Sequence, residues 1–384
     1  MPEAATNLGP RVLLGRMAPA VVLLCLLVDV TLRFVPSQLI AFRAWESMTL
    51  FAIGDGPFAL NAVYRNTRSY GDLANLANLP HLRQYREEVF TTDAAGYRNR
   101  REVAKPFSGI LLVGDSFTAG SGVSDELTLS EQLSELSGRP TYNGAEAQRF
   151  WELLDYLQMT RGLVVWQQSE RGPLPMKAAI TPDRELQPAQ TPADRKKTET
   201  LVRISKYAMS LESYSPLQTL SGRAVKLLQN DRILPNPYRT NVASAQLRNG
   251  REILFLPTEV SNFELDRPTD PEFFVQLKTQ LDQRGIRLLV LLVPDKYVVY
   301  RDLLLPAAPL TRREPFLDIV EQRLAAANVA ALNLTPRFRQ QANALLAREE
   351  YLYWLDDTHW NAEGIRDAAK ALTDSKAVSE CSCR

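Results

Sequence analysis

Short runs of branched aliphatic residues recur along this chain, and they constrain its fold more than any other feature. Residues 109–113 read GILLV, residues 163–166 read LVVW, and residues 287–293 read RLLVLLV. Runs of this length and composition are typical of strands that are buried on both faces, as in a parallel sheet covered by helices. We therefore predict an α/β fold built on a central parallel sheet.

Amphipathic patterns between these runs predict the covering helices. Strands that alternate with helices place helices on both faces of the sheet, which gives a three-layer α/β/α arrangement. Residues 172–240 are polar and rich in proline, so they are interpreted as a surface insertion, and Asn249-Gly250 signals a hairpin after it. Helices are expected at residues 127–136, 150–159, 216–229, 271–284, 315–326, 336–348 and 362–374, and further strands at 141–143 and 330–334.

An apolar segment lies near the N-terminus. Residues 17–28 form an uncharged run of 12 residues, preceded by Arg11 and Arg16 and ended by Asp29. A membrane-spanning helix typically needs about 20 apolar residues, and this run is shorter. It therefore fits a signal anchor, a cleaved signal peptide or a buried helix. We favour an uncleaved anchor, which predicts a single-pass transmembrane helix. Either signal interpretation places the rest of the chain outside the cytoplasm.

These patterns divide the chain into four parts. Residues 1–35 are the expected anchor, and residues 36–105 are a linker and lead-in, mainly helical or irregular up to residue 90. Residues 106–376 form the expected α/β domain, with an insertion at about 172–262, and residues 377–384 are expected to form an unstructured tail.

Charge and residue usage exclude several classes of function. The 45 Lys+Arg and 44 Asp+Glu residues leave a net charge of +1, which offers no basic face for nucleic acid. The three cysteines, Cys25, Cys381 and Cys383, lack a metal-binding spacing, and no glycine-rich phosphate loop is present. We therefore expect no metal and no nucleotide cofactor. With only two histidines, His81 and His359, histidine-based catalysis must use one of them.

Two polar segments lie next to predicted elements in a way that suggests a site. Residues 114–118 read GDSFT and come directly after the first buried strand, whereas residues 356–361 read DDTHWN and come just before the last helix. Loops at the carboxyl ends of parallel strands form the ligand crevice of an α/β sheet. We expect the two segments to meet there.

The residue types in these segments are those of nucleophilic catalysis. A serine nucleophile needs a base within hydrogen-bonding reach, and the base needs a carboxylate to orient it. Ser116 is the candidate nucleophile and His359 the candidate base. Asp356 or Asp357 is the candidate orienting group.

These motifs resemble those of the SGNH (GDSL-type) hydrolase superfamily. Residues 114–117 resemble its nucleophile block, and Asp356-x-x-His359 resembles its last block. Further similarity extends over roughly residues 90–375 to the SGNH-like domains of alginate and exopolysaccharide O-acetylation proteins. In those alginate proteins the Asp-x-His motif precedes the serine, whereas here the serine comes first. The similar segments read TTDAAGYRN at 91–99, ER at 170–171, VPDKYVVY at 293–300 and DDTHWN at 356–361.

The resemblance implies a fold, an activity and partners. The fold would be a flavodoxin-like α/β/α SGNH domain in the periplasm, held to the bacterial inner membrane. The activity would be O-acetyl transfer to an exopolysaccharide, with a membrane-bound O-acyltransferase as the acetyl source. A polysaccharide deacetylase or carbohydrate esterase, a non-catalytic glycan-binding or scaffold protein, and a cytoplasmic lipase-like enzyme are the alternatives.

The resemblance also carries over individual residues. Asp356 fits the D-x-x-H spacing of the esterases, whereas Asp357 and Trp360 fit the D-x-H-W pattern of the alginate-type proteins and favour Asp357. The Ser116 N–H is an expected oxyanion donor. SGNH esterases carry an asparagine in their third block. In this chain the corresponding residues, 167–171, read QQSER and contain no asparagine. Other candidates for the oxyanion hole or for substrate contact are Asn143, Gly144, Gln148, Arg171, Lys296 and Trp360, the last either a sugar platform or core packing.

Overall fold

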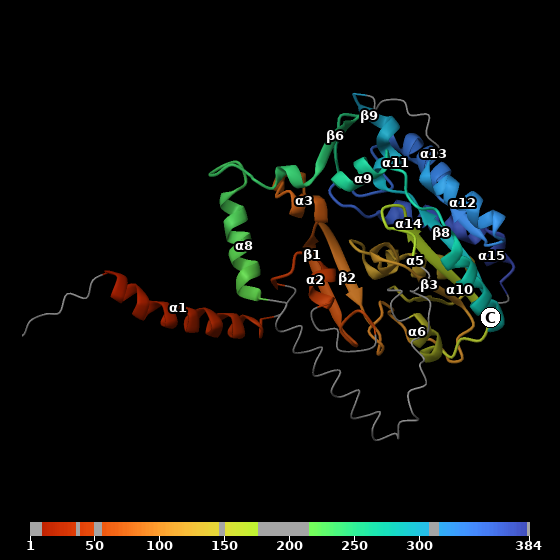
Figure 1. The fold of residues 1–384 in the computed structure, drawn as a ribbon, viewed down its shortest axis with the longest axis horizontal. Helices are drawn as coiled ribbons and strands as arrows, with labels where there is room; N and C mark the ends of the chain where they lie inside the picture. Colours follow the sequence, from red (N-terminus) through yellow and green to blue (C-terminus); the bar gives the residue numbers. More distant parts are fainter. Residues whose placement is uncertain are drawn as a thin grey trace, which may run out of the picture.

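A parallel five-stranded sheet forms the centre of the molecule (Figure 1). The computed structural model describes residues 10–35, 39–49, 56–145, 150–175, 215–306 and 315–381. Every pair of neighbouring strands in this sheet is parallel, which confirms the predicted α/β fold. From one edge to the other the strands are β10 (Ala331–Asn333), β8 (Ile286–Val293), β5 (Gly162–Ser169), β3 (Ile110–Val113) and β4 (Thr141–Asn143).

Helices cover both faces of this sheet, because alternate side chains of each strand point to opposite sides. Ile110 and Leu112 belong to one buried cluster, whereas Leu111 and Val113 belong to the other. The first cluster includes α5 (Leu129–Ser137), α11 (Lys296–Tyr300), α13 (Thr335–Leu346) and α14 (Ala362–Asp374). The second includes α6 (Phe150–Tyr156), α10 (Glu272–Gln283) and α12 (Phe316–Ala326). The predicted three layers are therefore present.

The lead-in differs from its mainly helical or irregular prediction. β1 (Val63–Ser69) and β2 (Arg86–Thr91) form an antiparallel pair, joined through α3 (Asp72–Leu76) and the 3₁₀ turn η2 (Pro80–Leu82). Alternate β2 side chains are buried, but two of these are Arg86 and Glu88. Because charged residues occupy the buried positions, the hydrophobic alternation that reveals a strand is missing. The short helix α2 (Ala44–Thr49) precedes the pair.

The insertion carries its own small elements, including the predicted helix and hairpin. α8 (Pro216–Leu228) is capped at its N-terminus by Ser215, whose hydroxyl donates to Asp29 Oδ1 over 2.6 Å. β6 (Ala243–Leu247) and β7 (Glu252–Phe255) form the hairpin at Asn249-Gly250, and β6 also pairs with β9 (Leu304–Leu305) in the order β7-β6-β9. Further short elements, inside and outside the insertion, are α4 (Ser116–Ala119), η3 (Asp125–Leu127), η6 (Arg239–Asn241), α9 (Pro257–Asn262) and η7 (Arg301–Leu303).

The N-terminal apolar run lies in α1 (Pro10–Leu32), which extends away from the sheet (Figure 1). Among the described residues, no helix combines the length and apolar character needed to cross a membrane, so the expected transmembrane helix is not found. The uncharged stretch ends at Asp29, and its 12 residues rise only about 18 Å against a hydrocarbon core of about 30 Å. Leu23 is 68% exposed, so the run is not a buried core helix either.

The end of the described chain is folded, not the expected tail. A short helix, α15 (Lys376–Ser379), follows α14, and Val378 and Cys381 are buried in the core. Cys381 is disulfide-bonded. Arg139 donates to the backbone carbonyls of Ser379 and Cys381, which fixes this end against the β4 side of the sheet.

Candidate active site

Ser116 lies at the carboxyl end of β3, where the chain turns sharply into α4. Asp115 caps this helix, because its Oδ1 accepts the Phe117 N–H over 2.9 Å. A Cβ on Gly114 would lie 2.4 Å from both Gln167 Oε1 and Thr118 Oγ1, so a side chain here would displace these two groups beside the turn. The turn therefore presents the Ser116 side chain at the edge where parallel strands form a ligand crevice.

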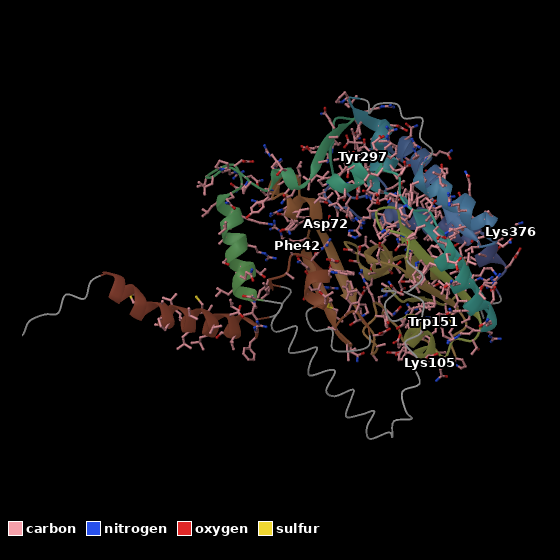
Figure 2. All side chains as sticks on the ribbon, in the orientation of Figure 1. Phe42, Asp72, Lys105, Trp151, Tyr297 and Lys376 are labelled. Carbon is pink, nitrogen blue, oxygen red and sulfur yellow. The ribbon has the colours of Figure 1, made fainter. Side chains whose placement is uncertain are left out.

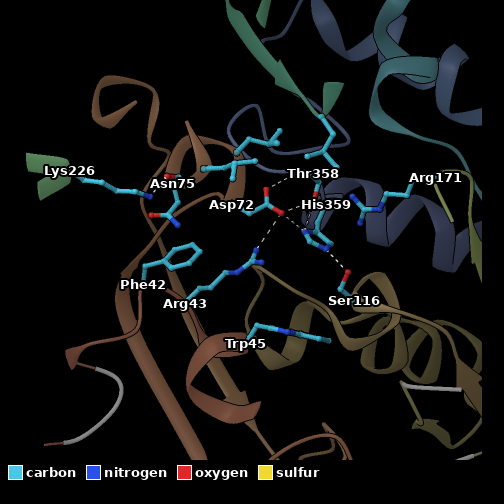
Figure 3. Close-up of a pocket in the computed structure, with 13 residues that line it drawn as sticks. Phe42, Arg43, Trp45, Asp72, Asn75, Ser116, Arg171, Lys226, Thr358 and His359 are labelled. Carbon is cyan, nitrogen blue, oxygen red and sulfur yellow. Dashed lines mark hydrogen bonds and ion pairs between the residues drawn. The ribbon is translucent and has the colours of Figure 1, made fainter. Parts of the chain in front are cut away.

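A continuous line of hydrogen bonds joins Ser116, His359 and Asp357, and Figure 3 shows the part of it between Ser116 and His359. The Ser116 hydroxyl lies 2.7 Å from His359 Nε2, and His359 Nδ1 lies 2.7 Å from Asp357 Oδ1. If Nδ1–H donates to the carboxylate, Nε2 is free to accept the serine proton. Burial opposes ionisation of Asp357, but His359 and Arg86 outweigh it and hold the pKa of this carboxyl well below its usual range. The arrangement can activate a serine nucleophile.

Asp356 points to different partners. Its Oδ2 accepts the backbone N–H groups of Gly71 and Gln84, each over 2.8 Å. Its Oδ1 accepts from Arg86 Nη1 over 3.0 Å. Burial raises the pKa of Asp356 above its ordinary value, and Arg86 counteracts this. Of the two aspartates that the sequence left open, Asp357 is the one bonded to the histidine.

Lead-in residues also contact this site, among them Arg86 and Asp72, neither of which the sequence motifs reveal. Arg86 Nη2 donates to Asp357 Oδ2 over 2.6 Å, and its side chain is 6% exposed. The Asp72 carboxylate accepts from the Thr358 N–H over 2.8 Å and from the Thr358 hydroxyl over 2.7 Å. Asp72 and Thr358 are 286 positions apart. Only contacts between distant segments reveal these residues, so motif spacing gives no signal for them.

A pocket of about 510 Å³ opens over Ser116 and His359. Its walls come largely from the lead-in, with Lys226 added from α8 and Arg171 from the loop after β5 (Figure 3). In Figure 2 the labelled Phe42 and Asp72 lie between α8 and the central sheet. The other lining residues are Arg43, Trp45, Leu73, Asn75, Leu76, Leu256 and Thr358.

Arg171 brings a positive charge to the pocket. Its guanidinium carbon lies 4.8 Å from the Phe117 ring centroid, and Nη1 lies 3.8 Å from Glu259 Oε1. Burial opposes its charge, but Glu259, Asp115 and Asp295 outweigh burial and raise the pKa of Arg171. This sequence-predicted residue therefore lines the same pocket as Ser116 as a cation.

Asn143 and Gly144, two of the candidates for the oxyanion hole or for substrate contact, support the fold and do not line the pocket. The Gly144 N–H donates to Leu112 O over 2.8 Å, so it is not available to an oxyanion. Asn143 is fully buried, and its Nδ2 donates to Thr118 O over 3.0 Å. Both residues tie β4 to the strand and turn that carry Ser116. Gln148 lies outside the described residues.

Lys296 and Trp360 also lie beneath the site. Lys296 Nζ donates to Leu355 O over 3.0 Å and to Asp357 O over 2.9 Å. Burial lowers the pKa of Lys296 to about 8. Trp360 is fully buried and meets Phe117 edge-on at 5.3 Å between ring centroids. Of the two interpretations of Trp360, core packing is therefore the one that its position supports.

Acidic and histidine side chains cluster here without an obvious need for a metal. Among the described residues, potential ligand atoms of Asp72, Asp357 and His359 lie within 4.8 Å of one another. However, Nδ1 of the histidine is bonded to Asp357, and Thr358 donates twice to Asp72. Arg43 and Arg86 supply positive charge to the same carboxylates. The geometry therefore fits a hydrogen-bonded triad of Ser116, His359 and Asp357.

The comparisons with known proteins agree with the family resemblance over part of the chain. Residues 255–379 match the family model described as the SGNH hydrolase-like domain of acetyltransferase AlgX. This segment contains Asp357 and His359, whereas Ser116 and the lead-in precede it. A search of curated proteins found no match to the chain. The match supports an acyl-ester enzyme of the acetyltransferase or esterase type.

Proposed function

We propose that this chain is an SGNH-type O-acetyltransferase that acts on an exopolysaccharide through Ser116, His359 and Asp357. The observation that carries the proposal is the pair of 2.7 Å contacts linking these three side chains at the pocket. The match to the AlgX acetyltransferase model over residues 255–379 supports the same reaction class.

The first half-reaction would form an acetyl-serine. His359 Nε2 takes the hydroxyl proton as Ser116 Oγ attacks the acetyl carbonyl carbon of the donor ester. Asp357 stabilises the imidazolium that results. The carbonyl oxygen gains negative charge, which the Arg171 guanidinium and the Ser116 N–H are suited to stabilise. The bond to the donor oxygen then breaks, and that oxygen leaves with the proton from His359.

The second half-reaction would move the acetyl group to a sugar. His359 removes the proton of an acceptor hydroxyl, whose oxygen attacks the acetyl carbon. The bond to Ser116 Oγ breaks and the serine recovers its proton. The 510 Å³ pocket is much larger than an acetyl group requires. Trp45 on its wall is partly exposed and offers an apolar ring, which suits the packing of a sugar ring.

An acetyl esterase is the second candidate. Ser116 is only partly buried, so water can reach an acetyl-serine in place of a sugar hydroxyl. The same three residues would then act, and only the acceptor would differ. A purely non-catalytic glycan-binding role is less consistent with the 2.7 Å contact between Ser116 and His359.

The proposal also includes export of the protein from the cytoplasm. It further includes a membrane-bound O-acyltransferase that supplies the acetyl donor. The apolar run at residues 17–28 behind Arg11 and Arg16 has the composition of a signal sequence. A compartment-sensitive reporter fused to the C-terminus tests the location. Reporter activity confined to the cytoplasm would favour a cytoplasmic enzyme instead.

The central test uses the full chain with p-nitrophenyl acetate, with and without acetyl-accepting oligosaccharides. Wild type is compared with Ser116→Ala and with Ser221→Ala, which changes an exposed serine on α8. Acetylated oligosaccharide that depends on Ser116, detected by mass spectrometry, would establish the transferase. Ser116-dependent release of acetate to water alone would favour the esterase. Equal turnover by Ser116→Ala and wild type would contradict both.

A further inference from the structure

We propose that Arg86 is the positioning residue of the catalytic centre, and that it acts on His359 through Asp357. This inference rests on the proposed function, since it concerns the same three side chains. Arg86 lies on β2 in the lead-in, outside the segment that matches the acetyltransferase family model. The lead-in would therefore be part of the active unit and not a linker.

The first argument is the geometry of the Asp357 carboxylate. Its two oxygens have different partners, because Oδ1 contacts His359 Nδ1 and Oδ2 accepts from Arg86 Nη2 over 2.6 Å. The Asp72 N–H also points at Oδ2, over 3.3 Å. A carboxylate held at one oxygen cannot rotate its other oxygen away from the imidazole.

The second argument is that the same guanidinium reaches the nucleophile side. Arg86 Nε donates to Gly122 O over 3.1 Å, and Gly122 follows the helix that begins with Ser116. The guanidinium carbon also lies 4.2 Å from the Trp354 ring centroid, which orients its plane. Arg86 thus contacts the loops of both the base and the nucleophile. Lysine lacks the planar fork needed for this set of contacts.

The third argument concerns charge. Asp356 and Asp357 are adjacent in the chain, and both side chains are fully buried. Two adjacent buried carboxylates need a nearby cation to stay ionised in the folded state. Arg86 supplies this cation because it contacts both. A role limited to charge neutralisation would also explain these contacts, so the test must separate it from positioning.

The experiment compares Arg86→Met, Asp356→Asn and the double variant Arg86→Met/Asp356→Asn with wild type, all as the full chain. Arg65→Met is the matched control, because Arg65 lies on β1 and is exposed. Three quantities are measured: Tm, kcat for p-nitrophenyl acetate, and the far-downfield proton NMR resonance of the His359–Asp357 hydrogen bond. The double variant removes Arg86 but also one of the two buried charges that Arg86 neutralises.

We expect Arg86→Met to lower both Tm and kcat. In the double variant we expect Tm to recover while kcat stays about 100-fold below wild type, since small misplacement of a catalytic group is that costly. The downfield resonance should stay shifted or absent in the double variant, and Arg65→Met should match wild type in all three quantities. Recovery of kcat and the resonance together with Tm would overturn the proposal, leaving Arg86 as a charge partner only.

A conservative variant covers the case in which the methionine variants do not fold. Arg86→Lys keeps the charge but not the fork, so we expect a near wild-type Tm, a lower kcat and a moved resonance. A wild-type kcat and resonance in Arg86→Lys would contradict the inference. If wild type itself shows no Ser116-dependent turnover, the proposed function fails, and the resonance alone still decides the role of Arg86.

Discussion

Asp356 and Asp357 are consecutive residues, yet only Asp357 reaches the imidazole of His359. The Asp357 Oδ1 atom lies 2.7 Å from His359 Nδ1, whereas Asp356 Oδ2 accepts backbone N–H groups of Gly71 and Gln84. The two carboxylates therefore have different tasks. One orients the base, and the other fastens the base-carrying loop to the lead-in.

This division predicts unequal effects of the two isosteric variants. Asp357→Asn places an amide where Nδ1–H needs an acceptor, which favours the wrong histidine tautomer and should lower kcat by about 10³- to 10⁴-fold. Asp356→Asn keeps an oxygen for the two N–H groups and should retain most of kcat. Turnover of p-nitrophenyl acetate checks both variants, with Tm as the control for folding. A larger kcat loss in Asp356→Asn would show that the assignment of the orienting aspartate is reversed.

Arg171 is predicted to stabilise the transition state and not merely to bind substrate. The Gly144 N–H is already bonded to Leu112 O, so it cannot serve as an oxyanion donor, and Arg171 lines the pocket with Ser116. Loss of one oxyanion donor costs about 10²- to 10³-fold in kcat, which is the effect expected for Arg171→Met.

Steady-state kinetics separate the two roles of Arg171. We expect kcat and kcat/KM to fall together in Arg171→Met. Arg284→Met, which removes a partly exposed arginine paired with Asp155, serves as the control. An Arg171→Met enzyme with unchanged kcat and a raised KM for the oligosaccharide would instead assign Arg171 to acceptor binding.

The central sheet and its covering helices could be predicted from the sequence because their signals are local. The run at 286–293 is apolar at nearly every position, and α14 begins at Asn361, whose side chain accepts the Glu363 and Gly364 N–H groups. The Ser116 and His359 motifs are likewise short and sit at predicted strand and helix ends. Local pattern therefore suffices for the sheet and for the two motifs that meet at its edge.

The supporting residues could not be predicted in the same way. Arg86 and Glu88 occupy buried positions of β2, so the hydrophobic alternation that reveals a strand is absent there. Asp72 meets Thr358 across 286 positions, a contact that depends on the complete fold. Lys296 is the opposite case, a residue that the sequence suggested for substrate contact but that supports the fold. It follows a strand end, as a substrate-binding lysine would, but its Nζ points inward to two backbone carbonyls.

This inward position predicts a stabilising role for Lys296. Lys296→Met would leave the carbonyls of Leu355 and Asp357 without their donor, and each buried unsatisfied group costs about 1–3 kcal/mol. We therefore expect the free energy of unfolding, measured with urea, to fall by a few kcal/mol. Lys370→Met changes an exposed lysine on α14 and should have little effect. Equal stability of the two variants would contradict the inward role of Lys296.

Behind Arg171, the buried Glu170 predicts a pH dependence of stability. Burial raises the pKa of Glu170 from 4.5 to about 8, and the nearby Asp295 carboxylate adds to this, whereas the Asp295 N–H and Arg267 oppose it. The pKa of Asp295 is itself raised to about 6, chiefly by burial. Between the ordinary and the raised pKa of Glu170, the folded chain therefore holds a proton that the unfolded chain releases.

The sign of the effect follows from this proton. Because the folded state binds more protons, the free energy of unfolding falls as pH rises, by up to about 1.4 kcal/mol per pH unit. Glu170→Gln removes the titrating group, so its stability should fall less steeply than that of wild type between about pH 5.5 and about pH 7.5. Glu152→Gln, an exposed change on α6, should keep the wild-type slope. Parallel urea-denaturation slopes for Glu170→Gln and wild type would mean that Glu170 is ionised throughout this range and that Arg267 outweighs its burial.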